Sequence, residues 1–151
     1  MAAYCEACTN ALDLAIANLP FDIKSAGVMG YARDYGGDYA DCGTAAAEAN
    51  GITVAWEYIV PSSEFDVAQA VGLMVTKTVD EYFPAIGPGF MAQVAGRAFQ
   101  QGITPISMMA APSYNDACPA EGFAKAHIFT TVSIQHMAFL DPVKPPSPVN
   151  A

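Results

Sequence analysis

The sequence predicts an α/β fold, a three-layer αβα sandwich around a mainly parallel sheet of five strands. Residues 22–114 repeat one alternation four times: an apolar strand, a polar or glycine-containing turn, then a helix or helix-like stretch. Parallel strands need a crossover of a dozen or more residues, which a helix supplies. The chain is also 53% hydrophobic and only 14% charged, as expected for strands covered on both faces. We expect one lobe over residues 1–140.

The first expected helix spans residues 10–18, where apolar residues recur at helical spacing. Thr9 or Asn10 could cap its start, and Pro20 ends it. The short, nearly apolar run 24–31 is the first strand.

A second helix is expected to open at Gly36-Gly37 and to end near Asn50-Gly51, a typical C-terminal stop. Its many alanines would let it lie close to the sheet. The second strand, residues 52–60, is dense in β-branched and aromatic side chains.

Ser62 or Ser63 is the expected cap of a third helix that runs through Thr76. Residues 80–86 form the third strand. Pro84 lies inside this strand and weakens its assignment, because proline donates no ladder hydrogen bond.

The Gly87-Pro88-Gly89 turn leads into a fourth helix that ends at Gln101-Gly102. Residues 103–109 are the fourth strand, and the alternation over residues 128–134 predicts a fifth. Residues 141–151 hold four prolines and are predicted to be an extended or disordered tail.

The charge balance excludes several kinds of partner. Fifteen acidic and six basic residues give a formal net charge of −9, which disfavours nucleic acid and anionic lipid. No apolar run approaches the roughly 20 residues that cross a bilayer. The N-terminus lacks the pattern of a secretory signal, so the protein is cytoplasmic if this chain is complete; otherwise an export signal lies outside it.

The four cysteines are Cys5, Cys8, Cys42 and Cys118. Cys5-Glu-Ala-Cys8 has the spacing of redox dithiols and of half a zinc site, but no strand precedes it. We interpret the cysteines as incidental thiols, without a metal site and without a disulfide framework.

Catalytic motifs are also lacking. The sequence has no G-x-S-x-G elbow, no Walker loop and no G-x-G-x-x-G, and His127 and His136 lie away from the strand-end turns. We therefore expect a protein that is not an enzyme and that needs no cofactor.

The strand-end turns resemble those of a known family. Gly30-Tyr-Ala-Arg-Asp-Tyr-Gly-Gly37 looks like the turn after the first strand of the C-terminal lobe in type I solute-binding proteins. These are the periplasmic receptors of branched-chain amino acid and amide ABC transporters. The later turns are similar to the family's in order and spacing, namely residues 61–66, 86–90, 102–106 and 111–116. The resemblance implies a flavodoxin-like, Rossmann-like lobe.

The resemblance also implies a binding edge for an amino acid or amide-like ligand. Tyr35 stands where the family often places a ring against the ligand. Ala110 and Ala111 fall where amino-acid binders carry an acidic side chain. The residues implied as ligand-binding are Tyr31, Arg33, Tyr35, Phe65, Gly87, Pro88, Gly89, Phe90, Ala111, Ser113 and Tyr114.

Family members clamp the ligand between two lobes, and this chain holds one. A single lobe would leave its aromatic edge in water, so we expect a homodimer or a higher homo-oligomer. Two alternatives stay open: a folded fragment that binds no small ligand and only self-associates, and a small flavodoxin-like enzyme.

Overall fold

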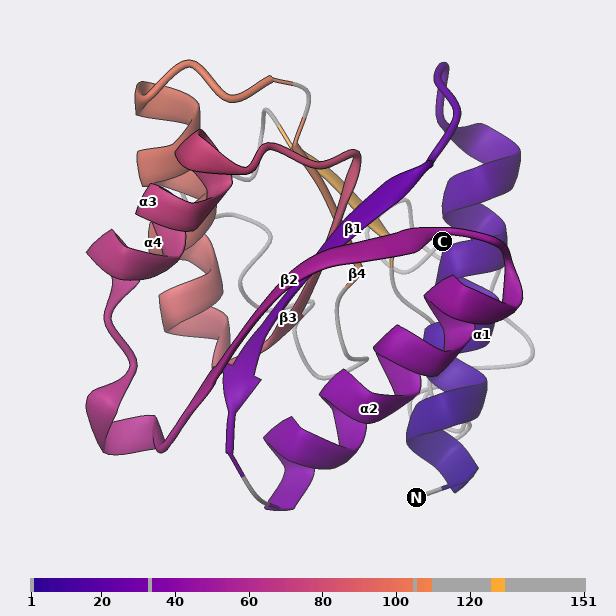
Figure 1. Cartoon of the computed structure of the whole chain (residues 1–151), viewed down its shortest axis with the longest axis horizontal. Helices are drawn as coiled ribbons and strands as arrows, with labels where there is room; N and C mark the ends of the chain where they lie inside the picture. The colour runs from indigo at the N-terminus through magenta and orange to yellow at the C-terminus, as the bar shows by residue number, and fades with distance from the viewer. Residues whose placement is uncertain (1, 33, 105, 110–125, 130–151) are drawn as a thin grey trace, which may run out of the picture.

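The expected αβα sandwich is present in a computed structural model, which describes residues 2–32, 34–104, 106–109 and 126–129 (Figure 1). Helices cover both faces of one sheet, and this confirms the fold class. The elements are α1 (Ala2–Asn18), β1 (Ser25–Tyr31), α2 (Asp34–Ala49), β2 (Thr53–Val60), the 3₁₀ turn η1 (Ser62–Glu64), α3 (Val67–Thr76), β3 (Glu81–Ala85), α4 (Pro88–Gln100), β4 (Ile106–Met109) and β5 (Ala126–Phe129).

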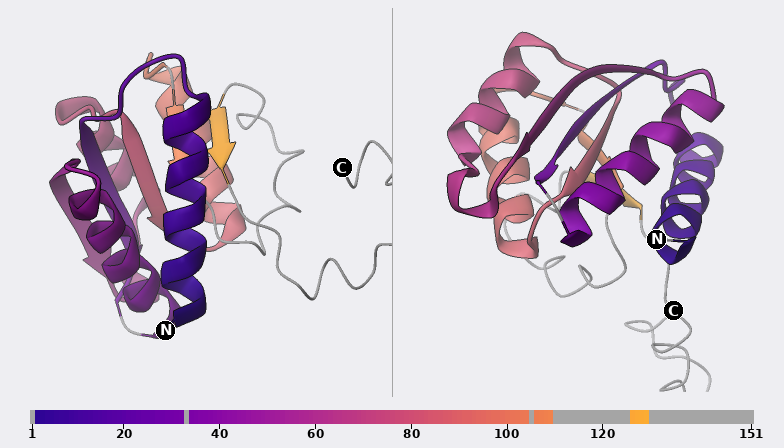
Figure 2. Two further views of the ribbon diagram at one scale, coloured as in Figure 1. Left: turned by 90° about the vertical axis from the view of Figure 1, so that its right-hand side faces the viewer. Right: turned by 60° about the horizontal axis from the view of Figure 1, so that its bottom comes forward.

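The five strands lie in the order β2-β1-β3-β4-β5, and every neighbouring pair is parallel. Helices α1 and α2 lie on one side of the sheet and α3 and α4 on the other (Figures 1 and 2). The chain therefore leaves β1 toward one face and leaves β3 toward the opposite face. Such a switch point opens a crevice above the carboxyl ends of two adjacent strands.

Small residues allow large rings to fill the core. A Cβ at Gly27 would lie 2.3 Å from the Trp56 ring, so only glycine leaves room for it. The indole Nε1 of Trp56 donates to the Lys77 carbonyl oxygen at 2.9 Å. On the other face, a Cβ at Gly43 of α2 would lie 2.6 Å from the Phe83 ring, which confirms that α2 packs closely on the sheet.

Strand β3 is central and all five of its residues are buried, so the weakening expected from Pro84 is wrong. Pairing with β1 continues through Pro84, opposite Met29. The described pairing with β4 runs through Tyr82 and Met108, two residues before the proline. The pairing with β1 therefore holds the proline-containing end of β3 in the sheet.

The amino ends of β1 and β3 are tied together by one carboxylate. Asp80 Oδ2 accepts hydrogen bonds from the backbone N–H of Lys24 at 2.9 Å and of Ser25 at 3.0 Å. It also accepts from the Ser25 hydroxyl at 3.0 Å. These bonds fix where the two central strands begin.

Several predicted boundaries move. Helix α1 begins at Ala2, so Thr9 is not its cap; the Thr9 hydroxyl donates to the Cys5 carbonyl oxygen one turn back. The Asp66 carboxylate, rather than a serine, caps α3. The predicted stops at Gly51 and Gly102 are confirmed by φ angles of 71° and 83°.

At the other boundaries, α2 begins at Asp34, β4 begins at Ile106 and β5 spans Ala126–Phe129, so the fifth strand starts earlier than predicted. Residues 130–134, His136, Cys118 and the tail 141–151 lie outside the described residues. No helix in the described part of the chain is long and apolar enough to cross a membrane.

The interpretation of the cysteines as incidental thiols is wrong for two of them. Cys5 of α1 and Cys42 of α2 form a disulfide, with their Cα atoms 4.7 Å apart. Cys8 is a free, buried cysteine whose Sγ lies 3.7 Å from the Tyr39 carbonyl oxygen. Spacing in the sequence could not show that the α1–α2 crossing brings Cys5 and Cys42 together.

Candidate functional site

The carboxyl ends of β1, β2 and β3 bring predicted site residues from separate parts of the chain together. Tyr31 ends β1, Phe65 follows η1, and Phe90 lies in the first turn of α4. The ring centroids of Tyr31 and Phe65 are 5.7 Å apart, those of Tyr31 and Phe90 are 6.4 Å apart, and those of Phe65 and Phe90 are 5.6 Å apart. We call Tyr31, Phe65, Gly87 and Phe90 the aromatic rim.

The Tyr31 side chain links the two segments that meet at the switch point. Its hydroxyl oxygen accepts a hydrogen bond from the Gly87 backbone N–H at 3.1 Å, which joins the end of β1 to the turn after β3. Within the rim, Tyr31 and Phe90 are half-buried, whereas Phe65 is buried. The rim therefore offers partly exposed ring surface and one phenol oxygen.

A second tyrosine, Tyr58, packs against Phe65 of the rim and binds the start of α3. The Tyr58 hydroxyl accepts from the Asp66 backbone N–H at 3.1 Å and lies 3.2 Å from Gln69 Oε1. The rings of Tyr58 and Phe65 are 5.4 Å apart. The Asp66 carboxylate accepts from the N–H groups of Ala68 and Gln69 and so fixes the start of α3. Sequence reasoning missed Tyr58, although its position near the end of an aromatic strand was a usable signal.

The start of α4 adds backbone donors beside the rings. Gly87 is the N-cap residue and makes no side-chain cap hydrogen bond. Gly89 is exposed, and nothing lies within 4 Å of the place where its Cβ would be. The first N–H groups of a helix have no partner within the helix, and the helix dipole favours negative charge there.

The remaining predicted site residues are described only as backbone or lie outside the described residues. Arg33, Ala111, Ser113 and Tyr114 lie outside the described residues. Tyr35 lies in the first turn of α2 and Pro88 is the first residue of α4, and only their backbone is described.

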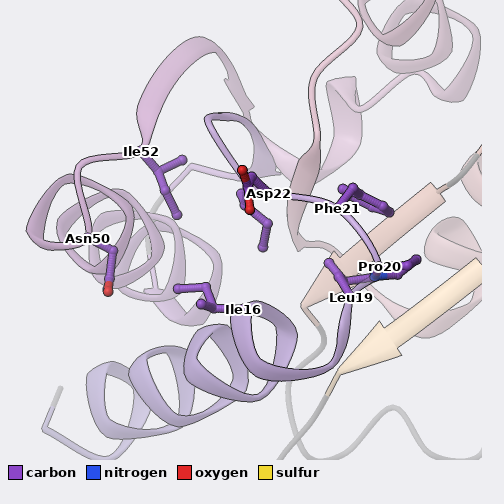
Figure 3. Close-up of a pocket in the computed structure, with 8 residues that line it drawn as sticks. Ile16, Leu19, Pro20, Phe21, Asp22, Asn50 and Ile52 are labelled. Carbon is purple, nitrogen blue, oxygen red and sulfur yellow. The ribbon is translucent and has the colours of Figure 1, made fainter.

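A pocket of about 530 Å³ opens at the opposite edge of the sheet, where β1 and β2 begin (Figure 3). Ile16 comes from α1, and Asp22 and Ile52 come from the segments that enter the two strands. Its full lining is Ile16, Leu19, Pro20, Phe21, Asp22, Ile23, Asn50 and Ile52. This pocket is separate from the switch point. Six of its eight lining residues are apolar, but polar atoms supply more of its exposed wall than apolar atoms do.

No protein-family model and no curated protein matches the chain. Solved structures do match. A fatty acid ABC transporter substrate-binding protein from Thermomonospora curvata gives a TM-score of 0.68 at 22% identity, over 83% of this chain and 33% of that one. The chain has the fold of one lobe of a type I solute-binding protein.

Two further solute-binding proteins give the same result. A leucine-binding protein from Thermotoga maritima has a TM-score of 0.65 at 16% identity, over 80% of this chain and 34% of that one. A solute-binding protein from Rhodopseudomonas palustris in complex with 3,4-dihydroxybenzoic acid has a TM-score of 0.63 at 21% identity, over 80% of this chain and 34% of that one. The chain spans about a third of the length of each of these proteins.

Proposed function

We propose that this chain is a non-catalytic ligand-binding lobe that holds an amino acid or amide-like small molecule at the aromatic rim. The observation that carries the proposal is the meeting of Tyr31, Phe65 and Phe90 above the β1–β3 switch point. In open α/β sheets, ligands bind in the crevice outside the carboxyl ends of the strands. The rim lies at the carboxyl ends of β1 and β3, where this rule expects such a crevice.

The groups at the rim favour a ligand with two kinds of surface. An apolar part would lie against the half-buried rings of Tyr31 and Phe90. A carboxylate or an amide oxygen would accept from the N–H groups of Gly89 and Phe90, the first that α4 offers after Pro88, because these groups and the helix dipole favour negative charge. Amino acids and amides carry such an oxygen, and so do the fatty acid and dihydroxybenzoic acid named for two of the similar proteins.

A single lobe supplies only half of a clamp. The part of this chain that matches covers only about a third of each similar solute-binding protein. We propose that two copies associate through their rims, which removes the aromatic edges from water and forms a cleft between subunits. Sedimentation velocity at micromolar concentration tests this, and a monomer at every concentration would refute the dimer without refuting ligand binding.

The position of the buried polar side chains argues against the enzyme alternative. Among the described residues, the buried polar side chains are Glu81 and Ser107, at the amino end of β3 and on β4. Glu81 therefore lies at the far end of β3 from the rim. The purified protein is expected to be colourless, and a bound flavin would make it yellow and favour the enzyme alternative.

A thermal-shift screen tests ligand binding. A ligand that binds only the folded chain raises Tm by mass action, and at 100 times Kd it adds about 2.7 kcal/mol. The panel contains amino acids, amides, aliphatic carboxylates and hydroxybenzoates. If none of the compounds in the panel raises Tm, the result would favour the alternative of a folded fragment without a ligand.

A matched pair of variants locates the site. Phe90→Ala removes a rim ring from the first turn of α4, and Phe99→Ala removes an exposed ring near the end of the same helix. We expect Phe90→Ala to weaken binding at least about tenfold and Phe99→Ala to leave it unchanged. Equal effects of the two variants would place the ligand elsewhere.

A further inference from the structure

The Cys5–Cys42 disulfide joins α1 to α2 through two cysteines that lie 37 residues apart in sequence. Cys5 is in the first half of α1 and is exposed, whereas Cys42 lies in the middle of α2 and is buried. Their Cα–Cα distance of 4.7 Å lies within the range of about 4.4–6.8 Å that disulfides normally span. The backbones of the two helices are therefore already close enough for the bond.

Over residues 5–18, where the burial of α1 is described, the other contacts bury mostly small side chains. Within these residues, the side chains that are at most 1% exposed are Cys8, Ala11, Leu12 and Ala15, and Leu12 is the one large side chain among them. Leu14 and Ile16 are each 46% exposed and add little. Hydrophobic stabilisation follows the apolar area removed from water, so α1 gains less of it than a helix with several large buried side chains.

The position of α1 in the chain also allows it to separate. It packs against α2 and touches β4 and β5, but it precedes β1 and is not a crossover between two strands. Its release would therefore break none of the backbone pairing between strands.

We propose that the Cys5–Cys42 bond is the cross-link that holds α1 on the lobe, and that the lobe is completed by oxidation of these two thiols. The thiols lose two protons and two electrons, and the electrons reduce the disulfide of a thiol–disulfide oxidoreductase to a dithiol. The exchange passes through a mixed disulfide at the exposed Cys5, and the buried Cys42 resolves it. Such bonds persist in oxidising compartments, so this lobe matures outside the reducing cytosol.

Cys8 is one helical turn from Cys5 and is the other cysteine in the described part of the chain that could compete for the bond. It is fully buried, and its Sγ lies against the Tyr39 carbonyl oxygen. While α1 is packed on the lobe, burial raises the pKa of the Cys8 thiol to about 11, which leaves little thiolate to attack the Cys5–Cys42 bond. The structure therefore assigns the bond to Cys5 and Cys42 and leaves Cys8 as a small core residue.

Hydrogen exchange with and without a reductant tests the proposal on the wild-type chain. We expect reduction to raise the exchange rate of α1 amides at least about tenfold while amides of β1 and β3 stay protected, and to lower Tm by about 10 °C. Equal α1 exchange and equal Tm in the two states would overturn the proposal.

Two variants identify the cysteines involved. Cys42→Ser is expected to behave as the reduced protein does, with or without reductant. Cys8→Ala is expected to keep the full difference between the oxidised and reduced states, whatever its own stability. Peptide mapping of the oxidised protein should recover Cys5 linked to Cys42, and recovery of a bond that includes Cys8 would contradict the assignment.

Discussion

The buried carboxyl of Glu81 makes stability depend on pH in an unusual direction. Glu81 begins β3 and is 0% exposed. Its Oε2 accepts a hydrogen bond from the Ser107 hydroxyl, and no hydrogen-bond partner of its Oε1 is described. Burial raises the pKa of Glu81 from 4.5 to about 8; the nearby Asp80 carboxylate adds to the rise, whereas the hydrogen bond from Ser107 opposes it. Ionising this buried carboxyl lowers the free energy of unfolding, and the loss grows as the pH rises. We predict that replacing Glu81 by glutamine removes this loss.

The size of this change in unfolding free energy follows from proton linkage. The pKa of Glu81 is higher in the folded chain, so its favourable contribution is complete below pH 4.5 and is lost as the pH rises to about 8. Each pH unit in this window costs about 1.4 kcal/mol, so the full loss is at most roughly 5 kcal/mol. Glutamine leaves part of its amide unpaired, which costs about 1–3 kcal/mol at every pH. The variant is therefore expected to be less stable than wild type at pH 5 and more stable at pH 8.

Urea unfolding of both proteins at pH 5, 6, 7 and 8 measures this crossover. Glu57→Gln is the matched control, because Glu57 lies on β2 of the same sheet and is exposed. The difference in unfolding free energy between the control and wild type should stay nearly constant with pH. A constant difference for Glu81→Gln as well would show that the Glu81 carboxyl is ionised in the folded chain, and would refute the reasoning.

Two further predictions concern the packing of the central strands. Asp80→Ala removes three hydrogen bonds at the start of β1. In urea titrations it should lower the unfolding free energy by about 2–3 kcal/mol. An effect below about 0.5 kcal/mol, the size expected of a surface substitution, would show that these hydrogen bonds add nothing to stability. Gly27→Ala forces a methyl group into the Trp56 ring and should cost about 1–3 kcal/mol. Gly72→Ala on α3, where the added Cβ meets open space, should instead stabilise by about 0.5–1 kcal/mol; thermal melts that rank the two alanine variants the other way would contradict the packing described.

The sequence by itself determined the order of strands and helices. Its alternation of apolar runs and helical stretches predicts parallel strands, because a helix is needed to return the chain to the same edge of the sheet. The same logic places Tyr31, Phe65, Gly87 and Phe90 at one edge, and the structure confirms that they meet there. Glycine at positive φ is a local backbone requirement, so the helix stop at Gly51 was also readable.

Only the tertiary structure decided which residues meet across the layers. The Cys5–Cys42 bond depends on the crossing of α1 and α2, and the burial of Glu81 depends on strands that lie far apart in the sequence. Pro84 can lie in a central strand because β1 pairs with β3 through that residue. Periodicity and spacing describe neighbours along the chain, whereas these contacts join residues at least 26 positions apart. Such contacts are fixed by packing, which no local pattern encodes.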